Sequence, residues 1–191
     1  MGLSLVGIDC DLGEASVQIA SDSYSIGELA TRRLIDDGCS RILCLRNNSR
    51  MRMPANKRTD AYYDVVEQAG LPALVREVEF VKSDDEKSAV VAKILDENPD
   101  IDGIFAGDDT MAAICLNVMK QRGLSAPDDI KVVGADGARR TMTFMPDLTT
   151  VRQDIDRIGE LAAQSIIALV NGEKPESNIK LPVELIEGKT A

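Results

Sequence analysis

The sequence predicts an α/β fold, with a mainly parallel sheet and helices on both of its faces. Strand-like and helix-like segments alternate along the 191 residues, and strands separated by helices of about 12 residues are typical of βαβ units. The core must be aliphatic, because the chain has three Tyr, three Phe and no Trp. The segment Leu148–Gln153 has the β-branched composition of a strand and follows a strand-like segment that ends at Asp136. Open α/β sheets bind ligands at the carboxyl ends of their strands, so a ligand-binding domain is the first hypothesis.

Hydrophobic spacing and end signals place the elements in order. The apolar run Leu3–Ile8 is the first predicted strand, and the helix Tyr24–Asp37 ends at Gly38. Ser83 and Glu86 have the spacing of a capping box, which opens a third helix. The other predicted strands are Arg41–Leu45, Val75–Val81, Ile101–Ala106, Ile130–Val133 and Ile179–Ile186, and the other predicted helices are Arg58–Ala69, Thr110–Arg122 and Ile155–Asn171. Pro182 cannot donate a ladder hydrogen bond, so we expect the last strand at a sheet edge.

Composition bounds the class of protein. Hydrophobic residues make up 44% of the chain and charged residues 28%, which is ordinary for a soluble globular domain. The net charge of −10 argues against direct binding of nucleic acid, which needs clustered Lys and Arg. No apolar run approaches the length of a membrane-spanning helix, and Leu3–Ile8 is too short for a signal sequence. We therefore expect a cytoplasmic protein with no membrane partner.

The residue types present also exclude several chemistries. The chain has no His, which rules out metal sites with imidazole ligands and His-dependent catalytic triads. Its four cysteines form no C-x-x-C pair, so we expect buried free thiols. Glycine-rich phosphate-binding loops are also missing from the sequence. We expect neither a cofactor nor a metal.

Polar side chains follow the ends of the predicted strands. Because the carboxyl ends of parallel strands meet at one edge of the sheet, these side chains should lie close together. Each also has a simpler role open to it, namely capping the helix that follows, and we expect Asp109 to cap the helix at Thr110. The residues concerned are Asp9, Asp11, Arg46, Asp108, Asp109 and Asp136.

Arg58 stands at the start of a predicted helix, where a positive charge interacts unfavourably with the helix dipole. A carboxylate or a ligand nearby would explain it, and a solvated loop arginine is the alternative. The segment from Arg46 to Arg58 holds five basic residues in an otherwise acidic chain. Arginine suits phosphate and carboxylate, so this segment is a candidate anion site, although a solvated loop is the commoner outcome.

A series of motifs resembles the lactose-repressor (LacI/GalR) family of bacterial transcriptional regulators, in its periplasmic-binding-protein-like type I effector domain. Each motif alone is weak, but their order and spacing span nearly the whole chain. The matching pieces are Asp22–Ala30, Leu34–Gly38, Arg41-Ile42, Arg58–Tyr62, Ile104–Ala112, Pro127–Asp136, Leu148–Gln153 and Gly159.

The resemblance implies two similar lobes that hold a small polar effector, a sugar or a nucleobase-like molecule, between them, and no enzymatic activity. The positions that match its effector contacts are Asp9, Arg58, Asp108, Asp136 and Gln153. Two departures leave the identity of the effector open, an anion included. Asp108 stands where the family often has Asn, and Lys82 stands near an expected stacking aromatic, with Phe80 two residues away.

The resemblance also implies a division of the chain. Residues 1–20 are expected to be a remnant of the N-terminal lobe, 21–152 the C-terminal lobe, 153–178 a helix that belongs to the N-terminal lobe in the intact family, and 179–191 a returning strand and tail. DNA binding would then depend on an N-terminal helix-turn-helix outside this chain. We expect the apolar stripe of the helix to be buried within its own domain or, preferably, in a homodimer; the stripe consists of Ile155, Ile158, Ala162, Ile166 and Leu169.

Two other functions compete with this one. A transport-type periplasmic sugar-binding protein has the same fold, and fold similarity alone does not separate the two. Asp9-Cys10-Asp11 also resembles the D-x-D motif of haloacid-dehalogenase-type phosphatases, which use Mg²⁺. Against the phosphatase, no Thr follows Asp11, and the turn at Asp108 and Asp109 lacks the usual acidic pattern.

Overall fold

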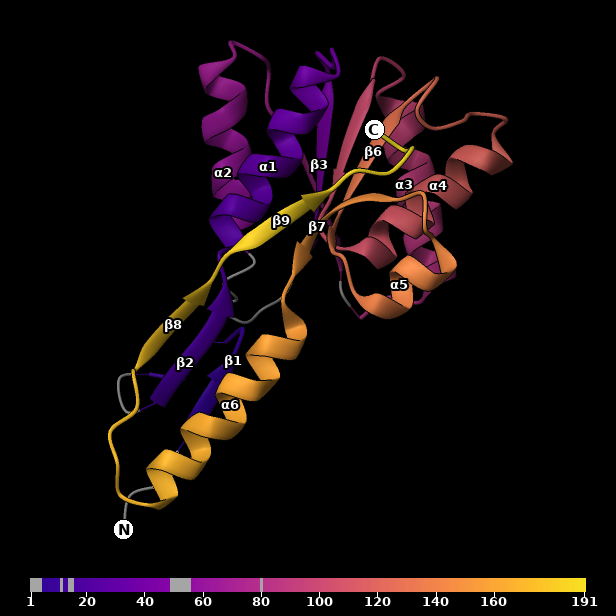
Figure 1. Cartoon of the computed structure of the whole chain (residues 1–191). Coiled ribbons are helices and arrows are strands. Elements are labelled where there is room, and N and C mark those ends of the chain that lie inside the picture. Colours follow the sequence, from indigo (N-terminus) through magenta and orange to yellow (C-terminus); the bar gives the residue numbers. More distant parts are fainter. Residues whose placement is uncertain (1–4, 11, 14–15, 49–55, 80) are drawn as a thin grey trace.

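Two sheets divide the molecule into a large lobe and a small lobe (Figure 1). The computed structural model describes residues 5–10, 12–13, 16–48, 56–79 and 81–191. The large lobe has a six-stranded sheet of order β4-β3-β5-β6-β7-β9, and the small lobe has a three-stranded sheet of order β1-β2-β8. All paired strands are parallel except β7 and β9, which are antiparallel. The predicted α/β class with a mainly parallel sheet is therefore confirmed.

The strands are β1 Leu5–Ile8, β2 Ser16–Ser21, β3 Ile42–Asn48, β4 Leu74–Glu79, β5 Gly103–Ala106, β6 Lys131–Asp136, β7 Thr149–Gln153, β8 Asn178–Leu181 and β9 Val183–Ile186. The helices are α1 Ser23–Asp36, α2 Asn56–Gln68, α3 Asp84–Glu97, α4 Asp109–Gln121, α5 Arg139–Phe144 and α6 Ile155–Val170. Between these elements the chain crosses from one lobe to the other three times, at Asp22, Asp154 and Pro182.

The large sheet is covered on both faces, with α1 and α2 on one side and α3 and α4 on the other (Figure 1). Side chains alternate between faces along a strand, so in β5 Ile104 enters the core under α3 and α4 whereas Phe105 enters the core under α1 and α2. All four residues of β5 are buried. A central strand buried on both faces is what a parallel sheet requires.

Close packing of α1 on α2 places the start of α2 over the sheet. A Cβ atom on Gly27 would collide with the backbone carbonyl of Arg58, so only glycine permits this approach. Farther along α2, the buried Tyr62 hydroxyl donates a hydrogen bond to the carbonyl of Ile42 at 2.7 Å and accepts one from the amide of Leu74 at 2.8 Å. These contacts fix α2, and with it Arg58, relative to β3 and β4.

The small lobe consists of β1, β2 and β8 with α6 packed on one face (Figure 1). Its buried centre is Val17, Ile19 and Ile158, with Leu161, Leu169 and neighbouring aliphatic side chains partly buried around them. The predicted single strand over residues 179–186 is wrong, because Pro182 interrupts it. β8 pairs with β2 of the small sheet, and β9 pairs with β7 of the large sheet. Both halves are edge strands, as expected from Pro182.

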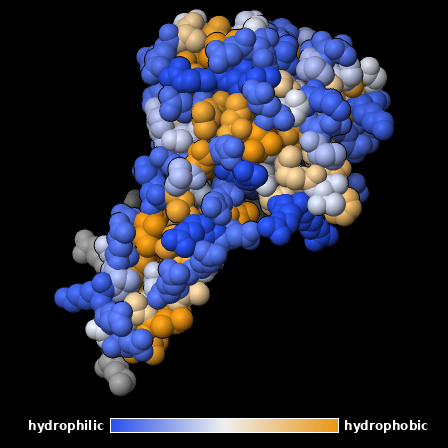
Figure 2. Space-filling view, viewed as in Figure 1, coloured by the Kyte–Doolittle hydropathy of each residue, from blue (hydrophilic) through white to orange (hydrophobic). Residues whose placement is uncertain are grey.

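The expected buried stripe of α6 is only partly correct. Ile158 is 3% exposed, whereas Ile155 is 50% exposed and Ile166 is 38% exposed. Ile167 and Val170 are also exposed, so the helix has apolar residues on more than one face. Spacing alone could not identify the face that meets the sheet. The structure places α6 on β1 and β2 of its own chain, and hydrophobic residues remain on the surface of the small lobe (Figure 2).

Two elements were not predicted, the strand β2 and the short helix α5. β2 has the sequence SVQIAS, which alternates as a strand does but lies in a polar stretch after β1. α5 has six residues and no side-chain cap at its start. Neither segment has the length or the end signals on which the other assignments depended.

Candidate functional site

Three of the five predicted site residues meet where the large sheet faces the crossing between lobes. Arg58 Nη2 lies 3.1 Å from Asp136 Oδ1, and Gln153 Nε2 donates to the same oxygen at 2.6 Å. Arg58 Nη1 donates to the carbonyl of Gly107 at 2.6 Å. The Arg58 side chain is 11% exposed and that of Asp136 is 33% exposed. The four groups form one polar cluster, which we call the Arg58 cluster, at the carboxyl ends of β5, β6 and β7.

The backbone at Asp136 is strained. Among the described non-glycine residues, only Asp9 and Asp136 have positive φ angles, of 48° and 111°. Such conformations cost roughly 1–3 kcal/mol each and persist where the surrounding structure enforces them, often at functional sites. Gly137, which follows Asp136, has a φ of 57°, and a Cβ there would lie 2.7 Å from Arg152. The turn after β6 is thus held in one conformation.

Burial raises the pKa of Asp136 above its ordinary value, and the negative charge of Asp108 adds to this. The Arg58 charge and the hydrogen bonds from Arg58 and Gln153 oppose the increase. A single guanidinium therefore does not fully compensate the carboxylates gathered here. The Arg58 cluster favours ligand groups that donate hydrogen bonds to carboxylate oxygen.

Asp108 is the N-cap of α4, and its Oδ1 accepts a hydrogen bond from the amide of Met111 at 2.7 Å. The prediction that Asp109 caps this helix is therefore wrong by one residue. Sequence alone could not choose between two adjacent aspartates, since either has the side chain that an N-cap prefers. The influence of Asp108 on the pKa of Asp136 shows that it also borders the Arg58 cluster.

Asp109 lies at the predicted edge of the sheet, but its part there differs from the helix cap that we expected. It is 3% exposed and lies beneath the turn after β6. Its Oδ1 accepts a hydrogen bond from the Thr150 hydroxyl at 2.6 Å, and its Oδ2 accepts one from the amide of Gly137 at 2.8 Å. Besides its position after a predicted strand, the signal for a buried role was its place on the helix face of Ala112, which is otherwise apolar.

Asp9 follows β1 in the small lobe, and its amide donates to the carbonyl of Ile19 at 3.0 Å. In the part of the chain that the structure describes, no hydrogen bond or ion pair joins its side chain to the Arg58 cluster. The structure therefore unites Arg58, Asp136 and Gln153, places Asp108 beside them, and leaves Asp9 on the other lobe.

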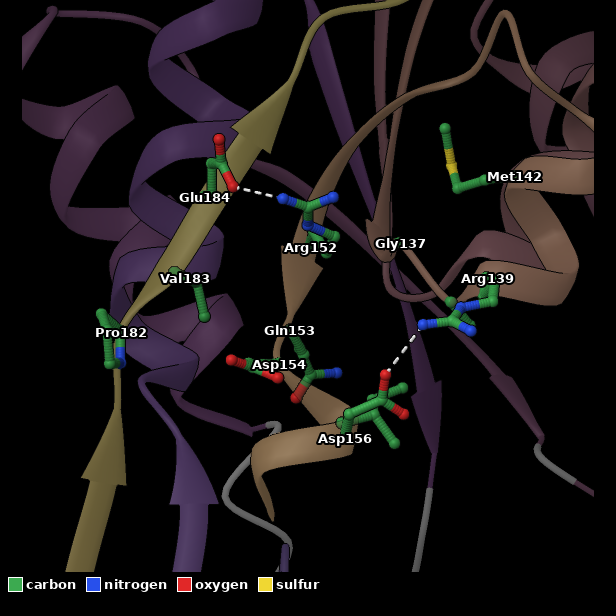
Figure 3. A pocket seen from close by; sticks show the side chains of 12 residues that line it. Gly137, Arg139, Met142, Arg152, Gln153, Asp154, Asp156, Pro182, Val183 and Glu184 are labelled. Atoms are coloured by element: carbon green, nitrogen blue, oxygen red, sulfur yellow. Dashed lines mark hydrogen bonds and ion pairs between the residues drawn. The ribbon is translucent and has the colours of Figure 1, made fainter. Parts of the chain in front are cut away.

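A cavity of about 520 Å³ lies beside the Arg58 cluster, between α5 and the lobe crossings (Figure 3). Two ion pairs flank it, Arg152 with Glu184 at 2.6 Å and Arg139 with Asp156 at 3.1 Å. Its volume lies within the range of roughly 300–1,000 Å³ that is usual for small-molecule sites. Gln153 belongs to both the cavity and the cluster, whereas Arg58, Asp108 and Asp136 do not line the cavity.

The basic segment from Arg46 to Arg58 is only partly within the described residues, because 49–55 lie outside them. Arg46 forms an ion pair with Glu77 on β4, and Arg58 belongs to the cluster described above. Lys82, which stands near the expected stacking position, lies 4.0 Å from Glu79. Phe80 and Asp11 are outside the described residues, so the structure is silent on the stacking aromatic and on the D-x-D motif.

Metal ligands, reactive thiols and membrane-spanning helices are the other functional features that we sought in the described residues. They contain no group of three or more acidic or cysteine side chains placed to hold a metal ion. Cys39, Cys44 and Cys115 are buried free thiols, as predicted, whereas Cys10 is partly exposed. Burial raises the pKa of Cys44 and of Cys115 to about 12, so neither is a reactive thiolate at neutral pH. None of the helices in the described ranges is long and apolar enough to cross a membrane.

The fold and the site define a class of protein. A parallel sheet, a second smaller lobe joined to it by three crossings, and a polar cluster at the carboxyl ends of the strands together describe a two-lobed α/β ligand-binding domain. Residues 31–191 match the family model of the periplasmic binding protein-like domain. The chain belongs to this family.

Individual relatives narrow the resemblance. The chain is 30% identical over 192 residues to the ribose operon repressor of Halalkalibacterium halodurans. This match covers 100% of this chain and 57% of the repressor. The chain is 31% identical to the sucrose operon repressor of Pediococcus pentosaceus, covering 100% of this chain and 59% of that protein. A solved structure of the transcriptional regulator CelR with cellobiose is 26% identical, has a TM-score of 0.84 and covers 97% of this chain and 58% of that one.

The chain thus spans little more than half the length of these curated relatives. All three are transcriptional regulators by name, so the resemblance to the lactose-repressor family is confirmed. Neither the phosphatase nor the transport protein is favoured by these comparisons.

Proposed function

We propose that the chain is the sugar-sensing part of a LacI-type transcriptional regulator. A small polar effector would bind between the two lobes at the Arg58 cluster and control DNA binding by a region outside this chain. The main support is that Arg58 and Gln153 both donate to the same carboxylate oxygen of Asp136 at the strand ends. The names of the relatives, repressors of ribose and sucrose operons and a regulator with cellobiose, support a sugar.

The charge of the site favours a neutral sugar over an anion. Asp136 belongs to the cluster and Asp108 borders it, and Arg58 is the cation that contacts Asp136. Sugar hydroxyls donate to carboxylate oxygens and accept from a guanidinium, so one ligand can satisfy both. An anionic effector would add a negative charge to a place where the pKa of Asp136 is already raised.

The division into lobes stays a proposal, with its boundaries amended. Ser21 ends β2 of the small sheet and Gln153 ends β7 of the large sheet, so we assign residues 22–153 to the C-terminal lobe and move the expected boundaries at residues 20 and 152 by one residue each. Because β8 pairs with β2, we move the last boundary from residue 178 to Pro182. The crossing at Pro182 then joins β8 of one lobe to β9 of the other.

Three further parts of the proposal concern the intact protein. We infer that it is cytoplasmic, that it is not an enzyme, and that it acts as a homodimer. The dimer is supported by apolar side chains that the described chain leaves exposed, including Phe144 at 76%, Val170 at 76% and Ile167 at 60%. Exposed apolar residues that adjoin one another, as Ile167 and Val170 do on α6, are typical of protein interfaces, whereas a single one such as Phe144 is ordinary on a surface.

Titration calorimetry with D-ribose, sucrose and cellobiose tests the function. We expect at least one of these sugars to bind, and we expect Asp136→Ala to weaken its binding about 10- to 150-fold, because a partly buried, charged hydrogen-bond partner is lost. Asp96→Asn is the matched control, since Asp96 pairs with Arg122 on the outer surface of the same lobe. Unchanged affinity in Asp136→Ala would remove the cluster from the binding site, and failure of all three sugars would count against sugar sensing.

A further inference from the structure

The two carboxylate oxygens of Asp109 accept hydrogen bonds from Thr150 and Gly137, and the carboxylate lies directly beneath the turn that presents Asp136. Asp109 joins three elements, because it begins α4, accepts from Thr150 on β7 and accepts from Gly137 after β6. Both oxygens of the carboxylate have a donor, at 2.6 Å and 2.8 Å. A carboxylate that is 3% exposed is costly to bury, so its retention needs a reason.

We propose that Asp109 is a positioning residue, whose ionised carboxylate fixes the turn from Asp136 to Gly137 and thereby sets the affinity of the effector site. The inference deepens the proposed function of the Arg58 cluster and rests on it for the effect on ligand binding. The effect on the turn itself is a property of the free protein and does not depend on any ligand.

The hydrogen bond to Gly137 acts directly on the geometry of Asp136. The amide of Gly137 belongs to the peptide group that joins Asp136 to Gly137, so holding its N–H fixes the backbone rotation on the carboxyl side of Asp136. This matters because Asp136 has a φ of 111°, which a non-glycine residue adopts only under constraint. If this bond weakens, Asp136 can relax and its carboxylate moves away from Arg58 and Gln153.

The space around Asp109 is shaped for the carboxylate. A Cβ on Gly134 would lie 2.5 Å from Asp109 Oδ1, so the strand β6 approaches this oxygen as closely as glycine allows. Thr150 is fully buried and directs its hydroxyl at the same oxygen. The neighbours thus leave room for an acidic side chain and for little else.

The charges around Asp109 make its ionisation sensitive to pH. Burial raises its pKa to about 6, and the carboxylates of Asp136 on β6 and Asp108 on its own helix act in the same direction. The hydrogen bonds from Thr150 and Gly137 oppose the increase. Arg58 of α2 faces Asp136, and β7 contributes the neutral hydroxyl of Thr150. Protonation therefore replaces two charge-assisted hydrogen bonds by weaker neutral ones in weakly acidic solution.

Two substitutions separate charge from shape. Asp109→Asn keeps an oxygen for the Gly137 amide and places an NH₂ group beside the Thr150 hydroxyl, which can accept, so it mimics the protonated acid. Thr150→Val removes one donor while keeping the volume and the charge. Asp96→Asn, on the outer surface of the large lobe, is the control for removing a carboxylate. Circular dichroism spectra check that each variant is folded before any comparison.

The first measurement uses the free protein and amide NMR between pH 4.5 and 7.5. We expect the Gly137 amide and the side-chain NH₂ of Gln153, which donates to Asp136, to shift together with one midpoint in wild type and in Asp96→Asn. In Asp109→Asn the Gly137 amide should lose the transition caused by Asp109 and keep any shift caused by Asp136 itself. The Gln153 resonances at pH 7.5 should already be displaced from their wild-type position. A Gln153 signal that is the same in Asp109→Asn and wild type at pH 7.5 would overturn the positioning role.

The second measurement is calorimetry with D-ribose, sucrose and cellobiose at pH 7.5. For a sugar that binds, we expect Asp109→Asn to weaken binding about 5-fold, the difference between charged and neutral hydrogen bonds, and Thr150→Val to weaken it less. Equal affinities in wild type and Asp109→Asn would overturn the link to the effector site. If no sugar binds any variant while Gly137 and Gln153 respond as expected, the proposed function fails and the positioning of Asp136 by Asp109 stands.

Discussion

The large lobe and the small lobe differ in how completely they bury their apolar side chains. The largest fully buried side chains of the described chain all lie in the large lobe, with the exception of Ile19. The small lobe has a three-residue buried centre and leaves Ile155, Ile167 and Val170 largely exposed on α6. A complete core is what holds Arg58 and Asp136 in place, so the site is built on the lobe that can support it. The small lobe has less buried apolar surface with which to hold a site.

Truncating a core residue of the large lobe should have the largest effect. Ile104 is fully buried beneath α3 and α4, so Ile104→Ala should lower the free energy of unfolding by about 4 kcal/mol, near the upper end for such cavities. Urea denaturation followed by circular dichroism measures this. A loss below about 1 kcal/mol would mean that the large lobe can collapse around the cavity, and the contrast between lobes would disappear.

The free energy of unfolding should depend on pH through Asp109, which is buried in the large lobe beneath the site. The pKa of Asp109 is raised from 3.8 to about 6 in the folded chain, so between these values the folded state binds more protons than the unfolded one. Stability should therefore fall as the pH rises from about 4 to 6 and stay level above, by about 3 kcal/mol from this group. The difference between wild type and Asp109→Asn in urea unfolding isolates it. A difference that does not vary with pH would contradict the raised pKa.

The matching truncation in the small lobe should cost less. Ile158 is 3% exposed, but its surroundings are partly open to solvent, so Ile158→Ala should lower stability by about 2 kcal/mol. Hydrogen exchange should show the loss mainly in the amides of β1, β2 and α6, since elements with few buried contacts open locally. An equal loss of protection in β5 would show that the two lobes unfold as one unit.

The smallest change in stability is expected on the exposed face of α6. Ile167 is 60% exposed, so Ile167→Lys should alter the free energy of unfolding by less than about 0.5 kcal/mol. If this face is covered by a second copy, the same change should reduce self-association in sedimentation experiments. Asn117→Lys is the control, because Asn117 is an exposed polar residue on α4 of the large lobe, away from this face. Identical sedimentation of both variants and wild type would exclude the face from the dimer.

The sequence was sufficient for elements with strong local signals. The capping box of Ser83 and Glu86 is present, with the Ser83 amide donating to Glu86 at 2.9 Å and the Glu86 amide donating to Ser83 Oγ at 3.3 Å. The alternation of helices and strands also predicted the large sheet. It did not predict that residues 178–186 divide between two sheets. A proline indicates where a strand is interrupted, but it does not indicate which strand pairs with the residues on either side.

For the site, local signals identified residues but not their roles. Arg58 stood out because a cation begins a helix, and its partner is a carboxylate across the sheet edge. Asp109 was expected at the strand ends, but its buried contacts were not, because they involve Thr150 and Gly137, which are 41 and 28 residues away in sequence. Long-range contacts of this kind appear only when the fold brings the strands together.

The proposed position of the effector is the Arg58 cluster on the large lobe. Amide NMR of the chain with increasing D-ribose, sucrose or cellobiose tests it most directly, because it reports the position of a bound sugar. We expect the shifted resonances to centre on Gly107, Asp136 and Gln153, where the cluster lies. Shifts centred instead on Arg139 and Glu184, across the neighbouring cavity, would place the ligand outside the Arg58 cluster and contradict the proposed position of the effector.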